Sequence, residues 1–271
     1  MKILITGGTG FIGSNLIRRL HPGNLIFETR RQDNLADILN HTSPDVVINC
    51  AAEIYRPAEM WQPNVEIVRS CLDYVVSNPS ASMIQMGSSS EYGPMDRASV
   101  ETDPLCAVNM YAGTKSIATM LCQSYAATYN TDVVVARPYS PFGPGEQPHR
   151  LFPRLWQSFK LDKPMDLVQG VHDFCYIDDF VDAIELIINS KQRTPGEIIN
   201  ISSGEQTYHS TLLEIFRKLT GKQGAVNENP VWATPKVWQA NISHIKEKYN
   251  WQPRYNIESG IAKFLKDANY E

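Results

Sequence analysis

A tyrosine and a lysine four residues apart are the side chains best suited to acid–base chemistry. Tyr111 and Lys115 occur in residues 109–115 (NMYAGTK), which predict the start of a helix. Residues four apart lie on one helix face, one turn above each other. An ammonium group stabilises a neighbouring phenolate, so the pKa of Tyr111 is expected to fall from about 10 towards neutrality. Tyr111 is therefore a candidate general acid or base, although ordinary solvated helix faces also carry this spacing.

A serine cluster could supply a hydroxyl partner for this tyrosine. Residues 81–86 predict a buried strand, and residues 87–93 (GSSSEYG) follow at its C-terminal end. Ligands in open α/β sheets bind at that edge of the sheet. Ser88, Ser89 and Ser90 could therefore hydrogen-bond a substrate oxygen beside Tyr111, although serine clusters are also common in plain loops.

A glycine-rich stretch near residue 1 predicts a dinucleotide-binding turn. The apolar strand expected over residues 2–6 runs into residues 7–13 (GGTGFIG), and an amphipathic helix is expected over residues 14–20. Glycines at the first, fourth and seventh positions allow a tight turn, a close approach to a pyrophosphate and close packing of the helix on the sheet. Strand, glycines and helix in this order indicate a dinucleotide site.

The end of the second predicted strand, residues 25–29, bears on which dinucleotide is bound. An acid at this tip would bind the ribose hydroxyls of NAD, whereas an arginine accommodates the 2′-phosphate of NADP. Counted from Gly23, Arg30 falls at the tip. The sequence therefore favours NADP. Glu28 lies two residues earlier, and a shift of the strand end would favour NAD instead.

Two further buried strands are expected at residues 45–52 (DVVINCAA) and 132–137. The first ends in Ala51 and Ala52, whose small side chains would let the nicotinamide half of a cofactor lie close to the sheet. Residues 138–145 (PYSPFGPG) begin a loop-rich region. Beyond it we expect a helix over 151–161, a short strand over 166–168, and a polar stretch that contains Trp232 and Trp238.

The composition is that of an ordinary globular protein. The chain has 271 residues, of which 42% are hydrophobic and 20% charged, and a formal net charge of −4. It lacks the basic stripe of a nucleic-acid-binding protein and an apolar run as long as a membrane span. Because the chain opens directly on a strand, no signal peptide is expected. Five scattered cysteines, never in a C-x-x-C pair, favour reduced thiols in a cytoplasmic protein and argue against a metal site.

Together these motifs resemble the extended short-chain dehydrogenase/reductase family of NAD(P)-dependent nucleotide-sugar epimerases, dehydratases and ketoreductases. The resemblance covers nearly the whole chain and also rests on residues 137–145 (RPYSPFGPG), 172–179 (HDFCYIDD), 200–204 (NISSG) and 251–253 (WQP). It implies an α/β fold with a Rossmann-type doubly wound parallel sheet and a smaller C-terminal α/β substrate lobe. The dinucleotide-binding domain is expected over 1–145, with return elements near 172–201, and the substrate lobe mainly over 146–271.

The resemblance also implies roles for single residues. Tyr111 would be the general acid or base, and Lys115 would hold the nicotinamide ribose and lower the tyrosine pKa. Ser88, or failing it Ser89, would hydrogen-bond the reacting sugar oxygen. The expected cofactor contacts are Gly7, Gly10, Phe11, Ile12, Gly13, Arg30, Arg31, Ala51, Ala52, Tyr111, Lys115 and Pro138. The expected substrate contacts are Ser88, Ser89, Ser90, Tyr111, Ser140, His149, Arg154 and His172.

Departures from the family pattern separate the possible reactions. Dehydratases of the family carry an acid directly after the catalytic serine or threonine, where this chain has Ser89 and Ser90. GDP-fucose-synthase-like enzymes carry a cysteine at the place of Ser90, and His149 is one residue away from their histidine. Residues 87–93 (GSSSEYG) and the arginine at the strand tip look most like those of a reductase that acts at C4 of a nucleotide-linked 4-keto-6-deoxyhexose, with NADP as the cofactor. The alternative is a 4-epimerase with tightly held NAD.

Other departures concern the substrate and the assembly. His172 stands where the family often has a diphosphate-binding arginine, so His149, Arg150 and Arg154 become candidates for that contact. Few residues separate Arg31 from the next helix, so the usual third strand is expected to be absent. The helices expected over 57–77 and 108–129 resemble a dimer-forming pair of many relatives, and a homodimer is expected. A binding protein without catalysis is the competing class, and the intact Ser-Tyr-Lys set counts against it.

Overall fold

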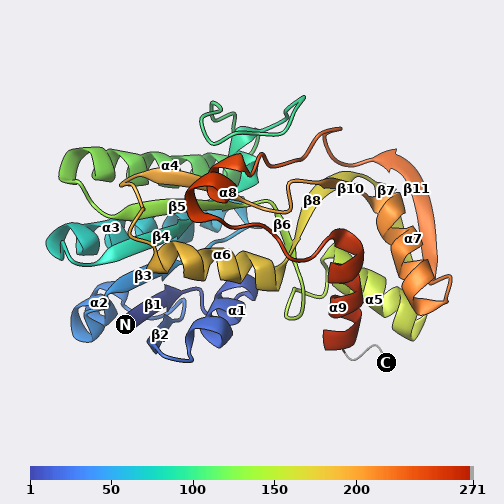
Figure 1. The fold of residues 1–271 in the computed structure, drawn as a ribbon, viewed down its shortest axis with the longest axis horizontal. Coiled ribbons are helices and arrows are strands. Elements are labelled where there is room, and N and C mark those ends of the chain that lie inside the picture. Colours follow the sequence, from blue (N-terminus) through green and yellow to red (C-terminus); the bar gives the residue numbers. More distant parts are fainter. Residues whose placement is uncertain (269–271) are drawn as a thin grey trace.

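The central element of the computed structural model is a six-stranded parallel sheet (Figure 1). The structure describes residues 1–268, so the last three residues of the lobe expected over 146–271 lie outside the described part. The strand order is β2-β1-β3-β4-β5-β9, and neighbouring strands all run parallel. The strands are β1 (Lys2–Thr6), β2 (Leu25–Thr29), β3 (Val46–Asn49), β4 (Ser82–Met86), β5 (Val133–Pro138) and β9 (Glu197–Ile201).

The strand order reverses between β1 and β3, and the doubly wound fold expected from the sequence is confirmed. In such sheets, ligands bind in the crevice at the carboxyl ends of the strands beside the reversal. Only residues 30–34 separate β2 from the helix α2 (Leu35–Thr42), and β2 forms the edge of the sheet among the described residues. The additional strand of the usual arrangement is therefore absent there, as the short spacing predicted.

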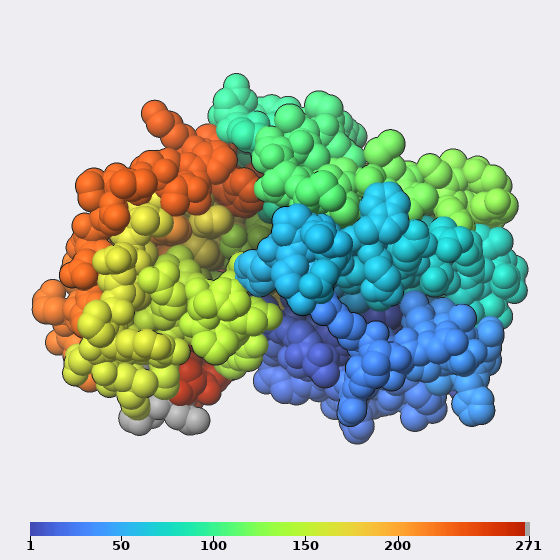
Figure 2. Space-filling view, turned by 180° about the vertical axis from the view of Figure 1, so that it is seen from behind, coloured from blue at the N-terminus to red at the C-terminus, as the bar shows by residue number. Residues whose placement is uncertain are grey.

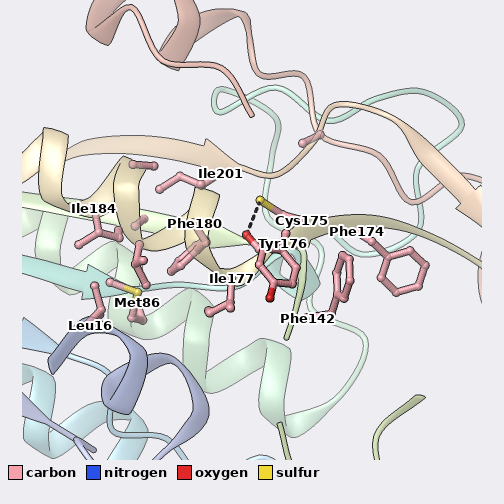
Figure 3. Close-up of a cluster of buried hydrophobic side chains, with 14 of the residues drawn as sticks. Leu16, Met86, Phe142, Phe174, Cys175, Tyr176, Ile177, Phe180, Ile184 and Ile201 are labelled. Carbon is pink, nitrogen blue, oxygen red and sulfur yellow. Dashed lines mark hydrogen bonds between the residues drawn. The ribbon is translucent and has the colours of Figure 1, made fainter. Parts of the chain in front are cut away.

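Alternate residues of the strands enter two separate cores. Ile3 and Ile5 face one side, with α1 (Phe11–Leu20) and α6 (Ile177–Asn189). Leu4 faces the other side, with α2, α3 (Ile67–Ser77) and α4 (Met110–Tyr129). Successive strand side chains point to opposite faces, so strands covered on both faces appear in the sequence as continuous apolar runs. Figure 3 shows the first core, in which Leu16, Met86, Phe180, Ile184 and Ile201 lie together.

A second group of elements lies beyond one end of the sheet (Figure 1). It contains α5 (Leu151–Leu161), β7 (Met165–Gln169), α7 (His209–Thr220), β11 (Val226–Trp232) and α9 (Ile257–Asp267). A three-stranded sheet of β10 (Gln206–Tyr208), β8 (Val171–Tyr176) and β6 (Ser140–Phe142) lies between this group and the main sheet, and α8 (Ser243–Tyr249) lies beside β9. Phe142 stacks on Phe152 of α5 with ring centroids 3.9 Å apart, which extends the first core into this group.

Three segments differ from the sequence-based expectation. Residues 57–77 do not form one helix, because a 3-10 turn over Pro57–Glu59 and a wider turn over Gln62–Glu66 precede α3. Pro63 lies in the wider turn and lacks the N–H that a regular helix needs. The loop-rich residues after 138 include the strand β6, and part of the polar stretch before Trp238 forms β11, which pairs with β7.

Candidate active site

The glycine-rich turn between β1 and α1 forms one wall of a cleft at the carboxyl edge of the sheet. Gly7 has a φ of +65°, and a Cβ added there would lie 2.8 Å from the backbone nitrogen of Ala51. A Cβ at Gly13 would overlap the carbonyl oxygen of Gly7. No side chain caps the first turn of α1, and that turn carries no acid. Its N–H groups can therefore receive an anion, and the turn fits the pyrophosphate of a dinucleotide.

Two cavities run along this cleft and share Gly7, Gly10, Cys50 and Ala52. We name them the Tyr111 cavity, of about 210 Å³, and the Arg30 cavity, of about 230 Å³. Each of the expected cofactor contacts lines one or the other. Of these contacts, the Tyr111 cavity is lined by Phe11, Ile12, Gly13, Tyr111, Lys115 and Pro138. The Arg30 cavity is lined by Arg30, Arg31 and Ala51. Gly7, Gly10 and Ala52 line both.

The Tyr111 cavity brings Ser88, Tyr111 and Lys115 together. Lys115 is 2% exposed, and its Nζ donates to the carbonyl oxygen of Met86 at 2.8 Å. Burial lowers the pKa of Lys115. Burial also raises the pKa of Tyr111, and hydrogen bonding by Ser88 offsets only part of the rise. The expected fall of the tyrosine pKa is therefore wrong for the chain by itself, because desolvation of the phenolate dominates.

A buried ion pair fixes the loop that carries Ser88. Glu91 Oε2 lies 2.8 Å from Arg137 Nη2, and both side chains are fully buried. The same oxygen accepts from Thr119 Oγ1 at 2.7 Å, and Oε1 accepts from the backbone N–H of Ser88 at 2.7 Å. The carboxylate of Glu91 is thus committed to holding the loop and does not line the Tyr111 cavity.

The chain turns away from the cleft directly after Ser88. Ser88 Oγ accepts from the N–H of Ser90 at 3.2 Å and caps a 3-10 turn over Ser89–Tyr92. Ser89 is 4% exposed, and neither Ser89 nor Ser90 lines the Tyr111 cavity or the adjoining cavity beside α5. Of the three serines, only Ser88 is placed beside Tyr111. The structure therefore gives Ser89 and Ser90, two of the expected substrate contacts, no place in the lining of either cavity.

A third cavity, of about 320 Å³, adjoins the Tyr111 cavity on the side of α5. We name it the His172 cavity. It shares Tyr55, Pro141 and Arg150 with the Tyr111 cavity. Its lining includes four of the expected substrate contacts, namely Ser140, His149, Arg154 and His172. The guanidinium groups of Arg150 and Arg154 line this region together with the carboxyl groups of Glu146 and Asp166, and guanidinium groups can bind phosphate.

Two imidazole rings form the inner part of this cavity. His172 and His209 stack with centroids 5.5 Å apart and planes 7° apart. His172 Nδ1 lies 3.1 Å from Ser140 Oγ. Burial, with smaller contributions from His209 and Arg150, lowers the pKa of His172 to about 4. His172 is thus neutral near pH 7 and does not replace the charge of an arginine.

Three lining residues of the His172 cavity had no signal in the sequence. Tyr55 OH lies 2.7 Å from His149 Nε2, and Figure 2 shows the light-blue and yellow-green parts of the chain meeting on this face. Glu146 Oε1 lies 3.3 Å from Arg150 Nε, and His209 begins α7. They come from segments far apart in the chain, so no local motif marks them.

The two arginines after β2 have different surroundings. Arg31 lies 2.9 Å from the carboxylate of Glu53 and 3.5 Å from that of Glu59. The guanidinium of Arg30 forms no ion pair with any described residue, and Asp33 accepts only from its backbone N–H at 2.6 Å. Glu28 lies against Gly8 and is not part of the Arg30 cavity, whose lining has no carboxylate.

Among the described residues, no cluster of three or more His, Cys, Asp or Glu side chains could hold a metal ion. None of the helices in residues 1–268 combines the length and apolar character that crossing a bilayer would require.

Comparisons with known proteins agree on one family and fold. The family model described as "NAD dependent epimerase/dehydratase family" matches residues 3–202. The Low-salt glycan biosynthesis protein Agl12 of Haloferax volcanii is 25% identical over 303 aligned positions, which cover 96% of each chain.

Among solved structures, dTDP-glucose 4,6-dehydratase of Bacillus anthracis in complex with NAD has a TM-score of 0.89 and 23% identity, covering 99% of this chain and 96% of that one. UDP-glucuronic acid 4-epimerase of Bacillus cereus, in complex with UDP-glucuronic acid and NAD, has a TM-score of 0.85 and 24% identity, covering 99% of this chain and 100% of that one. At these identities the structural matches show a common fold.

Proposed function

The chain belongs to the NAD-dependent epimerase/dehydratase family, and from this premise we propose that it reduces the C4 keto group of a nucleotide-linked 4-keto-6-deoxyhexose. The observation that carries the proposal is the Tyr111 cavity, which is lined by Ser88, Tyr111 and Lys115 and by no carboxylate. Such a site can transfer a proton to a carbonyl oxygen, but it offers no carboxylate base for the neighbouring carbons of the sugar.

Each member of the trio has a distinct task in this reaction. A nicotinamide dinucleotide, when bound, supplies the hydride. Tyr111 donates its phenolic proton to the C4 oxygen, and the Ser88 hydroxyl hydrogen-bonds the same oxygen. Lys115 is assigned to the nicotinamide ribose through the family resemblance. The raised pKa of Tyr111 keeps the phenol protonated near neutral pH, which suits an acid in the reductive direction.

Elimination of water is the reaction that the site supports least. A dehydratase needs a base for the proton next to the carbonyl carbon and an acid for the leaving hydroxyl. The carboxylate nearest in sequence to Ser88 is Glu91, which is bonded to Arg137 and to the Ser88 backbone. It is fully buried and cannot reach a substrate without breaking the loop that positions Ser88.

The His172 cavity is proposed to hold the nucleotide part of the substrate. Arg150 borders both this cavity and the Tyr111 cavity, so it suits a diphosphate that joins a sugar in one to a nucleoside in the other. Arg154, Ser140 and His149 line the same region. In this assignment residues 146–271 act mainly as the substrate lobe, as the resemblance implied.

NADP is the proposed cofactor. The Arg30 cavity has two arginines and no carboxylate in its lining, and within residues 1–268 Arg30 has no acidic partner that would compete with a 2′-phosphate. The solved relatives described above were obtained with NAD, so NAD is the alternative.

A 4-epimerase with bound NAD is the second candidate function. The likeness to UDP-glucuronic acid 4-epimerase favours it, and the same trio could first oxidise C4 and then reduce it from the other face. In that reaction Tyr111 must begin as a base. The raised pKa of this phenol disfavours that starting state in the chain alone.

A direct assay separates these functions. The protein is incubated with NADPH and a freshly made nucleoside-diphosphate 4-keto-6-deoxyhexose with each of several bases, and nicotinamide absorbance is followed. Consumption that is lost in Tyr111→Phe supports the reductase. Interconversion of C4 epimers without added cofactor supports the epimerase instead. Absence of both reactions with every base would reject the enzyme and favour a binding protein.

A homodimer in a reducing compartment is also proposed. Large apolar side chains are exposed on and beside α4, namely Trp61, Val108, Met110, Met120 and Tyr129, each more than half exposed. Pairing of this surface in two copies would remove it from water. All five cysteines are free thiols, which suits the cytoplasm. A monomeric mass in light scattering at micromolar concentration would contradict the dimer.

A further inference from the structure

Two buried hydrogen-bonding atoms line the His172 cavity without a partner. Nε2 of His209 and Oε2 of Glu146 are shielded from solvent and form no hydrogen bond within the described chain. The His209 residue is 7% exposed and the Glu146 side chain 5% exposed. An unpaired buried polar atom is destabilising, so two of them in one cavity indicate that a ligand supplies their partners.

The surroundings of His209 make its Nε2 an acceptor. Nδ1 of His209 lies 2.9 Å from the carbonyl oxygen of Val168. A carbonyl can only accept, so Nδ1 must carry the hydrogen and donate it. Burial lowers the pKa of His209, which keeps the ring neutral. The lone pair of the neutral ring is then on Nε2, and the missing partner must be a donor.

Glu146 presents a second acceptor. Its Oε1 is held by Arg150 Nε at 3.3 Å, whereas Oε2 has no partner. Burial raises the pKa of Glu146 to about 7, with Arg150 opposing the rise. Above that pH the group is a carboxylate with one unsatisfied oxygen. A donor from a ligand would stabilise this charged form.

We propose that His209 and Glu146 bind the two neighbouring hydroxyls of the ribose in a ribonucleoside diphosphate. The inference rests on the proposed function, in which the sugar lies at Tyr111 and the diphosphate at Arg150. The group that follows the diphosphate is then the ribose, in the His172 cavity. Its 2′- and 3′-hydroxyls are adjacent, uncharged donors, which matches two acceptors. The substrate class is therefore a ribonucleotide sugar rather than a 2′-deoxyribonucleotide sugar.

Calorimetric titration of the dinucleotide-loaded protein tests this inference without catalysis. The ligands are UDP, GDP, CDP and ADP, each beside its 2′-deoxy and 3′-deoxy analogue. For a base that binds, each analogue should bind about ten- to a hundredfold more weakly than the parent, because it leaves one buried acceptor unpaired. This comparison uses the unaltered protein, so misfolding of a variant cannot hide the result.

Two variants assign the hydroxyls. His209→Asn keeps a donor for the Val168 carbonyl but lacks the distal acceptor, and Glu146→Gln keeps the shape of the side chain while replacing one acceptor by a donor. In each variant, the difference in affinity between the parent nucleotide and one of the two deoxy analogues should disappear. The control is His149→Asn, because His149 lies in the same cavity but its Nε2 already contacts Tyr55. It should change the affinity for parent and analogues by the same factor.

The possible results of the titrations test the ribose inference separately from the proposed function. Parent and analogues within twofold of each other, or both differences kept in both variants, would overturn the inference and leave the proposed function intact. A single weakened analogue removed by a single variant would overturn the two-hydroxyl arrangement. If no nucleoside diphosphate binds, the inference fails together with the proposed function. Discrimination without any ketoreductase or epimerase activity would uphold the inference and reject only the reaction.

Discussion

The Tyr111 cavity and the His172 cavity meet at Arg150, but their walls are built differently. The first combines the glycine-rich turn with side chains such as Tyr111, and its Lys115 and Ser88 have partners within the chain. The second is formed by side chains from separate segments, and polar atoms of Glu146 and His209 lack partners. Groups that are already paired within the chain leave few contacts for a ligand to complete, whereas the unpaired atoms of Glu146 and His209 favour a ligand that supplies hydrogen-bond donors.

The largest expected effect separates chemistry from binding in the Tyr111 cavity. Tyr111→Phe removes the proposed proton donor and should lower kcat by roughly a thousandfold, within the range that a general acid contributes. Dinucleotide affinity, measured by fluorescence titration, should change by less than about threefold because the backbone turn is untouched. Retention of most of the activity in Tyr111→Phe would show that Tyr111 is not the proton donor and that the Tyr111 cavity is not where the proton is transferred.

The next effect concerns stability. Glu91→Gln leaves the buried Arg137 without its carboxylate and should lower the free energy of unfolding by about 3–5 kcal/mol. Glu146→Gln at pH 8 should cost less than about 1 kcal/mol, because its partner Arg150 is 43% exposed and water can solvate the guanidinium when the carboxylate is lost. Urea denaturation of both variants measures the difference. Equal losses of unfolding free energy in the two variants would mean that the Glu91 and Glu146 carboxylates contribute equally to stability.

A smaller effect concerns the pH dependence of stability and arises from His172. The pKa of folded His172 is about 4, below the ordinary value of 6.5. Between these values the unfolded chain binds a proton that the folded chain does not, so stability from this group is complete above about pH 6.5 and falls as the pH drops towards 4. Relative to His172→Gln, the wild type should lose about 1–2 kcal/mol more between pH 7 and 5. Parallel stability curves for both proteins would show that His172 titrates normally.

The smallest effect distinguishes the arginines of the Arg30 cavity. Arg30→Ala should weaken NADPH by roughly five- to tenfold and leave NADH unchanged, because only NADPH brings a phosphate to this guanidinium. Arg31→Ala is the matched control. Arg31 is already paired with Glu53 and Glu59, so its loss should affect NADPH less. Equal losses for NADPH and NADH in Arg30→Ala would reject the NADP assignment.

The contrast between the cavities also explains what could be predicted from the sequence. The ends of β1, β2 and α5 fall where the sequence predicted them, because apolar runs there end abruptly at polar or glycine-rich residues. The expected cofactor contacts line one cleft because a contiguous glycine motif and strand ends specify them locally. The local sequence is therefore sufficient to predict that these expected cofactor contacts lie together.

The residues of the His172 cavity are brought together by tertiary packing. Glu146 and His209 meet in one cavity only because β6, β8 and α7 pack together, and no spacing in the chain records this. The strand β11 was missed because it is polar and contains Pro230. The rise in the Tyr111 pKa also depends on burial, which the Tyr111–Lys115 spacing does not reveal.

The contact between Tyr55 and His149 has a kinetic consequence. It spans the boundary between the sheet side and the α5 side, and Tyr55 borders both the Tyr111 and the His172 cavities. A nucleotide sugar that extends from one cavity to the other must pass this contact and would then cover the reactive end of the dinucleotide. We therefore expect compulsory-order turnover, in which the dinucleotide enters first and leaves last. Product inhibition by the oxidised dinucleotide should then be competitive with the reduced form and non-competitive with the sugar.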